Sequence, residues 1–160
     1  MKNFIIEQVK ECDAKELYAL FYDTIHTINT KDYTQDQLDV WAPRGGDIST
    51  YIQKILSKHA ILARVKTLDK SVICGYGSID KYGFLDHLYV SKDFQHQGVG
   101  SLICDSLEDY AKTNGAKEFK VEASITAKEF FIHRGYELIQ EQTVYRKGVA
   151  LKNFLMKKYF

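Results

Sequence analysis

The sequence has little proline, few cysteines and almost no net charge, and each shortage argues against a class of protein. Its 160 residues contain one proline and three cysteines, an odd number without the spacing of a metal site. The formal charge of +1 gives no sign of a nucleic acid or a membrane surface as partner. We find no apolar run long enough to cross a bilayer and no signal peptide. We therefore expect a cytoplasmic protein with reduced thiols at Cys12, Cys74 and Cys104.

Hydrophobic periodicity switches between helical and extended along the chain. The expected strands are about residues 3–9, 60–66, 72–79, 84–90, 119–123, 136–146 and 149–159, and the expected helices about 13–29, 34–41, 48–56, 99–114 and 126–135. This order predicts one α+β (mixed α/β) domain over residues 1–160, with a mixed sheet and helices on both faces. Gly75 and Gly77 lie inside one expected strand, where they indicate a bulge or a close backbone approach.

The most informative segment is the glycine loop that follows the expected strand 84–90. Gly98 and Gly100 open an amphipathic segment, so free amides and the positive end of a helix dipole meet there, which suits a phosphate. A P-loop would need a lysine directly after its last glycine, and a dinucleotide fingerprint would need glycine where Ile103 stands. The remaining pattern is Gln/Arg-x-x-Gly-x-Gly/Ala, which begins at Gln95. A plain turn before a helix is the alternative interpretation.

This loop resembles the pyrophosphate loop of the GCN5-related N-acetyltransferase (GNAT) superfamily, which also has this order of elements. A second segment resembles the superfamily motif Asn-x-x-Ala-x-x-x-Tyr-x-x-x-Gly-Phe, with Ala127 and Gly135 matched, Tyr136 a conservative aromatic, Ser124 in place of asparagine and Phe131 in place of tyrosine. Residues 21–29, 32–33 and 41–43 are similar to a bacterial branch of acetyltransferases. The resemblance implies a single GNAT-like domain with about seven mostly antiparallel strands, splayed at the strand before the loop.

The resemblance further implies acetyl-coenzyme A as cosubstrate and direct transfer of its acetyl group to an amine in a ternary complex. A small-molecule acceptor is slightly favoured over a protein. The main chain of the strand would bind pantetheine and the loop amides would bind pyrophosphate, which implies the cofactor-binding residues Leu88, Tyr89, Val90, Gln95, His96, Gln97, Gly98, Val99, Gly100 and Ser101. A backbone N–H near Leu88 would stabilise the oxyanion. A non-catalytic acyl-coenzyme A-binding module and a nucleotide-binding protein of another fold are the alternatives.

The sequence leaves open which groups would move protons. Phe131 has no hydroxyl to protonate the departing thiolate, so Tyr145, Tyr89 or solvent would take that role. Asp86 and His87 are candidates for the base, and strand alternation predicts that at most one of them faces a shared cleft. Structural roles for both are equally compatible with the pattern. Glu122 on the neighbouring expected strand is a weaker candidate.

The N-terminal helical half covers the acceptor site in the superfamily, and the resemblance therefore implies an acceptor pocket there. Its candidate substrate-binding residues are His26, Tyr33 and Trp41, although ordinary packing is the favoured interpretation for any one of them taken alone. The five histidines show no spacing typical of a metal site. We expect no metal, no nucleic acid and no membrane as partners, and either a monomer or a homodimer.

Overall fold

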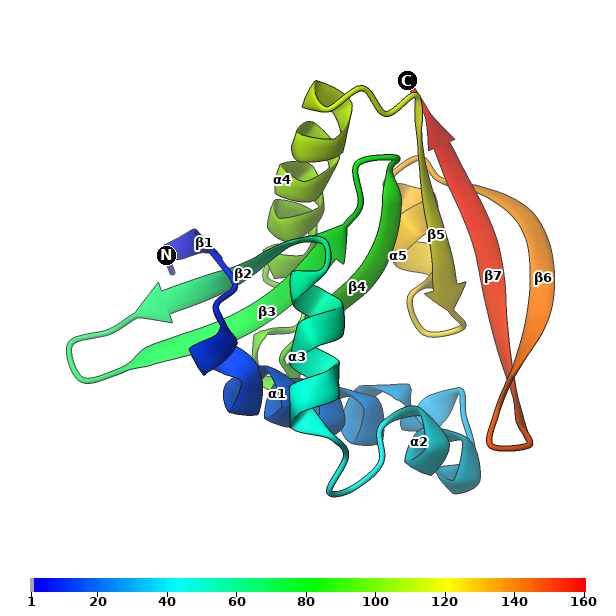
Figure 1. Ribbon diagram of the computed structural model, residues 1–160, viewed down its shortest axis with the longest axis horizontal. Helices are drawn as coiled ribbons and strands as arrows, with labels where there is room; N and C mark the ends of the chain where they lie inside the picture. Colours follow the sequence, from blue (N-terminus) through cyan, green and yellow to red (C-terminus); the bar gives the residue numbers. More distant parts are fainter. Residues whose placement is uncertain (1) are drawn as a thin grey trace.

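The structure is a computed structural model that describes residues 2–160 (Figure 1). The strands are β1 (Phe4–Gln8), β2 (His59–Lys66), β3 (Ser71–Ile79), β4 (Phe84–Val90), β5 (Glu118–Ser124), β6 (Glu137–Arg146) and β7 (Val149–Tyr159). The α-helices are α1 (Ala14–Ile28), α2 (Gln35–Trp41), α3 (Ile48–Leu56), α4 (Val99–Thr113) and α5 (Lys128–His133). Their order is the expected one, and the bounds of β4 and β7 agree with the prediction to the residue.

The seven strands form one sheet in the order β1-β2-β3-β4-β5-β7-β6. Neighbouring strands are antiparallel except β4 and β5, which are parallel and pair only at Phe84 with Lys120 and at Leu85 with Val121. Beyond this short pairing the two strands diverge toward the end of the molecule where α1 and α2 lie (Figure 1). The mixed, mostly antiparallel sheet with a splay at β4 confirms the predicted fold class.

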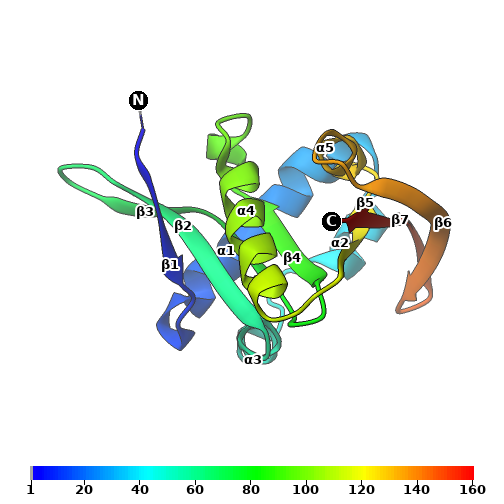
Figure 2. The same cartoon turned by 90° about the horizontal axis from the view of Figure 1, so that it is seen from above.

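Helices cover both faces of the sheet, and each face has its own hydrophobic core. Helix α4 packs across β2, β3 and β4 on one face, with α5 beside β5, whereas α1 and α3 lie on the other face (Figure 2). The close approach predicted at the two glycines of β3 is confirmed, because α4 and β4 both lie close to them. A Cβ atom on Gly75 would lie 3.1 Å from Val99, and one on Gly77 would lie 2.8 Å from the carbonyl oxygen of His87.

Hydrogen bonds fasten the N-terminal helical half to the end of the molecule where the sheet is split. The Tyr33 hydroxyl accepts from the amide of Ile125, just after β5, at 2.9 Å and donates to the carbonyl of Lys152 in β7 at 2.7 Å. Gln37 of α2 donates to the carbonyl of Ala150 at 2.9 Å. These bonds hold α2 and the β6–β7 hairpin beside the gap between β4 and β5.

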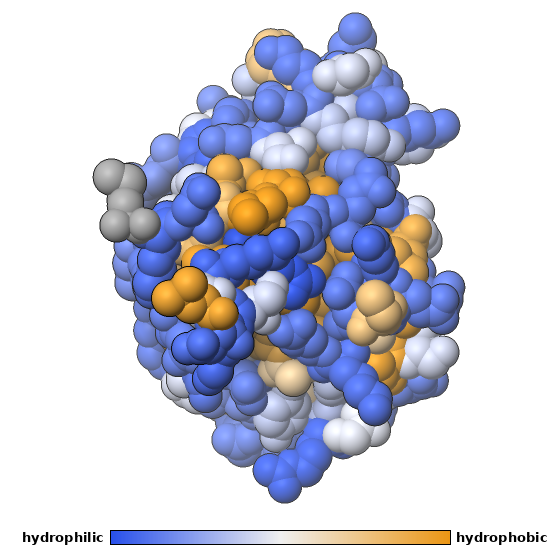
Figure 3. All heavy atoms as spheres, turned by 90° about the vertical axis from the view of Figure 1, so that its left-hand side faces the viewer, coloured by the Kyte–Doolittle hydropathy of each residue, from blue (hydrophilic) through white to orange (hydrophobic). Residues whose placement is uncertain are grey.

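The surface along the β1 edge of the sheet carries apolar residues in patches separated by hydrophilic ones (Figure 3). Ile5 on β1 and Leu68 in the β2–β3 turn are among the exposed apolar side chains. Within residues 2–160, none of the helices combines the length and the apolar character that a membrane crossing requires.

Candidate active site

The glycine loop joins the end of β4 to the start of α4. Gly98 is the N-cap residue of α4 and has φ +83°, a left-handed conformation that favours glycine. No atom lies within 4 Å of the position that a Cβ atom on Gly98 would take. The Gln95 side chain donates to the carbonyl of Val90 at 2.7 Å and thereby fixes the loop to the strand. The side chain of Gln95 therefore shapes the loop, and open space remains beside Gly98.

The first turn of α4 presents backbone N–H groups that have no acceptor. In the described part of the chain, the amides of Gly98, Val99, Gly100 and Ser101 donate to no carbonyl or side chain, and the first helical bond runs from Leu102 to Gly98 at 3.0 Å. Four free donors, the positive end of the helix dipole and open space beside Gly98 fit the diphosphate of a nucleotide-linked cofactor.

The edge of β4 that faces β5 is unpaired beyond Leu85. Ser91, directly after β4, donates to the carbonyl of Cys74 at 2.8 Å, and antiparallel pairing alternates from there. Tyr89 therefore uses its backbone groups toward β3, whereas Leu88 and Val90 direct theirs toward the gap. The carbonyl of Val90 already accepts from Thr24 at 3.1 Å and from Gln95. The groups left for an extended ligand are the N–H and C=O of Leu88 and the N–H of Val90.

A β-bulge in β4 corrects the expected alternation of Asp86 and His87. Ser78 pairs with His87 and the next residue, Ile79, pairs with Leu85, so that Asp86 is the extra residue of the bulge. Asp86 and His87 consequently lie on the same face of the sheet, and their side chains line the same hollow. The Asp86 carboxylate lies 3.5 Å from Nδ1 of His87.

Both side chains of the bulge are held by further partners. Lys58 donates to the Asp86 carboxylate at 2.9 Å, and the Ser78 hydroxyl is bonded to Nδ1 of His87 at 2.7 Å. Burial lowers the pKa of His87 to about 4, so its imidazole is neutral at physiological pH. Burial alone raises the pKa of Asp86, but the hydrogen bond from Lys58 and the nearby positive charges outweigh it and lower that pKa. The pair is thus an ionised carboxylate beside a neutral imidazole.

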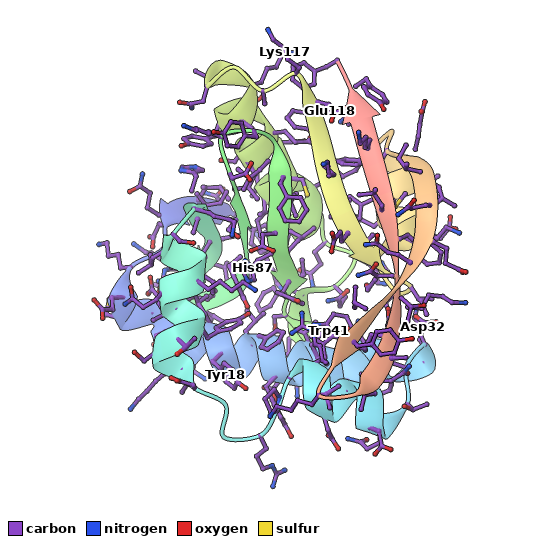
Figure 4. The ribbon with its side chains drawn as sticks, turned by 45° about the vertical axis from the view of Figure 1, so that its right-hand side comes forward. Tyr18, Asp32, Trp41, His87, Lys117 and Glu118 are labelled. Atoms are coloured by element: carbon purple, nitrogen blue, oxygen red, sulfur yellow. The ribbon has the colours of Figure 1, made fainter. Side chains whose placement is uncertain are left out.

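A cleft with two lobes opens in front of this pair. The β4–β5 lobe has a volume of about 130 Å³ and lies at the gap between the two strands, and the α3 lobe has a volume of about 260 Å³. Trp41, Asp86, Tyr89 and Arg146 line both lobes. His87 on β4, Trp41 at the end of α2 and Tyr18 on α1 face this region from three sides (Figure 4).

Aromatic side chains form the walls of the α3 lobe. They come from α1, α2, α3 and β4 and are Tyr18, Phe21, Trp41, Tyr51 and Tyr89. Burial raises the pKa of Tyr89 to about 12, so its hydroxyl keeps its proton at neutral pH. The hydroxyls of Tyr51 and Tyr76 are hydrogen-bonded to each other, and burial raises the pKa of both groups. Tyr89 is therefore a protonated phenol that lines both lobes.

The structure gives different positions to Tyr145 and Tyr89, the two tyrosine candidates for the acid, and to Phe131 at the motif position. Tyr145 is 72% exposed, and its neighbours Val144 and Arg146 line the cleft, so strand alternation turns Tyr145 to the opposite face. Phe131 is 2% exposed and packs edge-to-face against Phe130 and Tyr136 in the core on the α4 side of the sheet. Of these groups, Tyr89 alone both lines the cleft and carries a hydroxyl.

The three residues expected at the acceptor site have different positions. Trp41 lines both lobes and Tyr33 lines the β4–β5 lobe, as does Glu122. His26 lines neither lobe: it stacks on Tyr22, and its Nε2 is bonded to the carbonyl of Ala42 at 2.7 Å. The side chain of His26 therefore holds the loop after α2 in place rather than facing a ligand.

Sequence reasoning missed several cleft residues, of which Lys54, Tyr51 and Arg146 are the most informative. Lys54 and Tyr51 are on α3 and Arg146 ends β6, so they are brought together only by the tertiary fold. No local pattern indicates them, although the position of Arg146 beside the hairpin turn could have suggested a loop with function. Within residues 2–160, no group of three or more His, Cys, Asp or Glu residues is arranged to hold a metal ion.

Comparison with known proteins gives a consistent result. Residues 29–159 match the acetyltransferase (GNAT) domain family. The chain is 27% identical over 157 residues to the uncharacterized N-acetyltransferase YafP of Escherichia coli, covering 98% of this chain and 97% of that protein. A GCN5-related N-acetyltransferase structure from Rhodopseudomonas palustris superposes with a TM-score of 0.92 at 31% identity, covering 100% of this chain and 98% of that one.

A PaiA N-acetyltransferase structure from Thermoplasma acidophilum, in complex with coenzyme A, shares the fold with a TM-score of 0.77 at 14% identity and covers 99% of both chains. The split sheet and the glycine loop before α4 agree with the family match, which covers residues 29–159. The chain belongs to the GNAT family of N-acetyltransferases.

Proposed function

We propose that the protein transfers the acetyl group of acetyl-coenzyme A directly to an amine bound in the two-lobed cleft. The observation that carries the proposal is the continuity of free backbone groups from β4 into α4. The unpaired edge of β4 ends at Val90, and the four free amides of Gly98 to Ser101 lie close to it, since a Cβ atom on Gly100 would be 3.6 Å from the Val90 side chain. The cleft with Asp86 and His87 opens on the same strand. Solved structures that share this fold are in complex with coenzyme A or with acetyl-coenzyme A, which supports this use of the fold.

The cofactor would bind mainly through the main chain. The amides of Gly98 to Ser101 would hold the diphosphate, and the C=O of Leu88 and the N–H of Val90 would pair with the amides of pantetheine as an added strand does. The N–H of Leu88 faces the gap, where it would donate to the thioester oxygen as negative charge develops there.

The amine would be activated by the bulge pair. The neutral imidazole of His87 would accept the proton that the nitrogen loses as it forms its bond to the thioester carbon. The ionised Asp86 would stabilise the imidazolium, since it lies 3.5 Å from Nδ1 of His87. The imidazolium would then release its proton to solvent.

Collapse of the tetrahedral intermediate breaks the carbon–sulfur bond and releases a thiolate. Tyr89 would donate a hydrogen bond to that sulfur from its protonated hydroxyl. Because thiols are much more acidic than alcohols, the thiolate departs without a strong acid and takes its proton from solvent. Full proton transfer from Phe131 is impossible because it has no hydroxyl.

Thiol release from acetyl-coenzyme A over a panel of small amines tests the proposal, with coenzyme A binding measured separately by calorimetry. Amine-dependent thiol release supports it, and the amide product should appear in equal amount. Tight binding without turnover on any amine would support the alternative of a non-catalytic acyl-coenzyme A-binding module, which the replacement of the motif tyrosine by Phe131 favours. Stabilisation by a nucleoside triphosphate but not by coenzyme A would contradict both.

A further inference from the structure

The charged side chains that line the cleft differ between its two lobes, although Arg146 and Asp86 line both. The α3 lobe contains two cations, Lys54 and Arg146, and neither has an ion-pair partner within residues 2–160. Both carboxylates of that lobe are engaged: Asp86 accepts from Lys58 at 2.9 Å, and Asp47 accepts from the Thr50 hydroxyl at 2.7 Å. Asp86 is neutralised by Lys58, but Asp47 stays ionised beside a neutral hydroxyl. The two cations Lys54 and Arg146 exceed it and give the α3 lobe a net positive charge.

The β4–β5 lobe shares Arg146 and Asp86 with the α3 lobe but, within residues 2–160, has an unpaired carboxylate of its own. Its lysine, Lys152, is paired with Glu141 at 3.1 Å, whereas Glu122 has no ion-pair partner among the described residues. Asp86 lies between the lobes and is ionised. Because Lys54 lines only the α3 lobe and Glu122 only the β4–β5 lobe, a ligand with one positive and one negative group would be oriented along the cleft, with its ammonium or amine toward the β4–β5 gap and its anion toward α3.

We propose that the acceptor is an amine that also carries a carboxylate and an aromatic or apolar body, as an aromatic amino acid does, and that Arg146 with Lys54 binds the carboxylate. This inference rests on the proposed function. The guanidinium of arginine presents a planar fork of donors that matches a carboxylate, and its positive charge attracts an anion into the lobe. The aromatic walls formed by Tyr18, Phe21, Trp41 and Tyr51 suit the body of such a ligand.

The proposed orientation places the amine of the acceptor at the β4–β5 gap, where the thioester would lie. Arg146 lines both lobes together with Asp86 and Tyr89, so a carboxylate bound to it would keep an adjacent amine near the bulge pair. The charge of Arg146 also affects the side chains around the amine. Burial has the largest effect on the pKa of His87 and of Tyr89, and the charge of Arg146 has a smaller effect that lowers both pKa values. A carboxylate on Arg146 and an amine near His87 are thus compatible within one small ligand.

The test compares phenylalanine with phenethylamine, which differ by the carboxylate. The native enzyme should prefer phenylalanine in kcat/KM by about tenfold or more, the size typical of a hydrogen bond to a charged group. Arg146→Gln should remove most of this preference, mainly through a higher KM for phenylalanine, and Arg146→Glu should reverse it. Lys54→Gln should reduce it less. Lys147→Gln is the matched control, because it removes the same charge one residue away, outside both lobes.

Equal kcat/KM for the two amines in the native enzyme, or an equal loss for both in Arg146→Gln, would overturn the inference and leave the acetyltransferase proposal intact. If no amine is acetylated, the proposed function fails instead, and binding of phenylalanine to the protein saturated with coenzyme A still decides the inference. Calorimetry should then detect phenylalanine binding that Arg146→Gln weakens about tenfold. Absence of binding to the native protein would overturn it.

Discussion

The two proposed ligand-binding regions of the molecule are built in different ways. The proposed cofactor region is one contiguous segment, residues 84–101, and it offers mainly backbone groups: the free edge of β4 and the first amides of α4. The cleft is assembled from α1, α2, α3, β4, β5 and the β6–β7 hairpin, and it offers side chains. Backbone recognition tolerates change in side chains, whereas the cleft depends on which side chains the fold brings together.

This difference explains what the sequence could and could not predict. The glycine loop was predictable because Gly98 is needed for its left-handed φ and because free amides follow from the start of any helix. The paired positions of Asp86 and His87 were not, because alternation assumes regular pairing and a single extra residue in β4 breaks it. Arg146 could not be assigned to the site, because only the tertiary structure brings it into the same lobe as Lys54.

The element order was predictable because most segments have clear periodicity, and the splay at β4 followed from the family resemblance. The positions of His26 and Tyr145 were harder to predict. His26 is next to an apolar stripe, but the carbonyl of Ala42 takes its imidazole away from the cleft. Tyr145 is on a strand that lines the cleft, but its side chain is on the outer face. A shift of one residue in that strand would turn the side chain into the cleft.

The largest effect should come from removing the proposed base in the cleft. We expect His87→Ala to lower kcat by about 100-fold or more, the usual contribution of a positioned general base, with little change in coenzyme A affinity. His133→Ala is the control, because His133 is exposed on α5 and lines neither lobe. Steady-state kinetics and calorimetry on both variants measure these effects. If His87→Ala weakened cofactor binding as much as turnover, the cleft and the proposed cofactor region would not be separate.

The same histidine should make stability depend on pH. Its pKa is about 4 in the folded protein and 6.5 as the ordinary value, so the unfolded chain binds more protons between these limits. Its contribution is fully present above pH 6.5 and is lost as pH falls toward 4. From about pH 7 to about pH 4.5 the free energy of unfolding should fall by about 2 kcal/mol more in the native protein than in His87→Gln.

Urea unfolding at the two pH values measures this difference, since other titrating groups are common to both proteins. Equal pH dependence in the native protein and in His87→Gln would show that the imidazole is not held neutral by burial.

In the cofactor region, a pair of glycines on α4 separates backbone strain from ligand contact. Gly98 and Gly115 lie at the two ends of the helix with φ +83° and +94°, and neither has an atom within 4 Å of a Cβ position. Each change to alanine should cost about 1 kcal/mol of stability because of the left-handed conformation. Gly98→Ala alone should also weaken coenzyme A binding, by about tenfold, because its Cβ would enter the proposed phosphate space.

Thermal unfolding and calorimetry on this glycine pair would show whether the two effects are separate. Equal coenzyme A affinity in Gly98→Ala and Gly115→Ala would remove the loop from the proposed binding site.

The smallest effect should be that of the hydroxyl on Tyr89. Tyr89→Phe should lower kcat by about tenfold through loss of one hydrogen bond to the departing sulfur. Tyr145→Phe should change it less than about twofold, because that side chain is on the outer face of β6. A larger loss in Tyr145→Phe than in Tyr89→Phe would reverse the assignment and restore Tyr145 to the cleft.

A crystal structure of the protein with coenzyme A would locate the ligand relative to the free backbone groups. We expect pyrophosphate oxygens within hydrogen-bonding distance of the amides of Gly98 to Ser101, and pantetheine bonded to the C=O of Leu88 and the N–H of Val90 in the gap between β4 and β5. Coenzyme A bound elsewhere, with this gap closed or filled by side chains, would contradict the proposed binding mode.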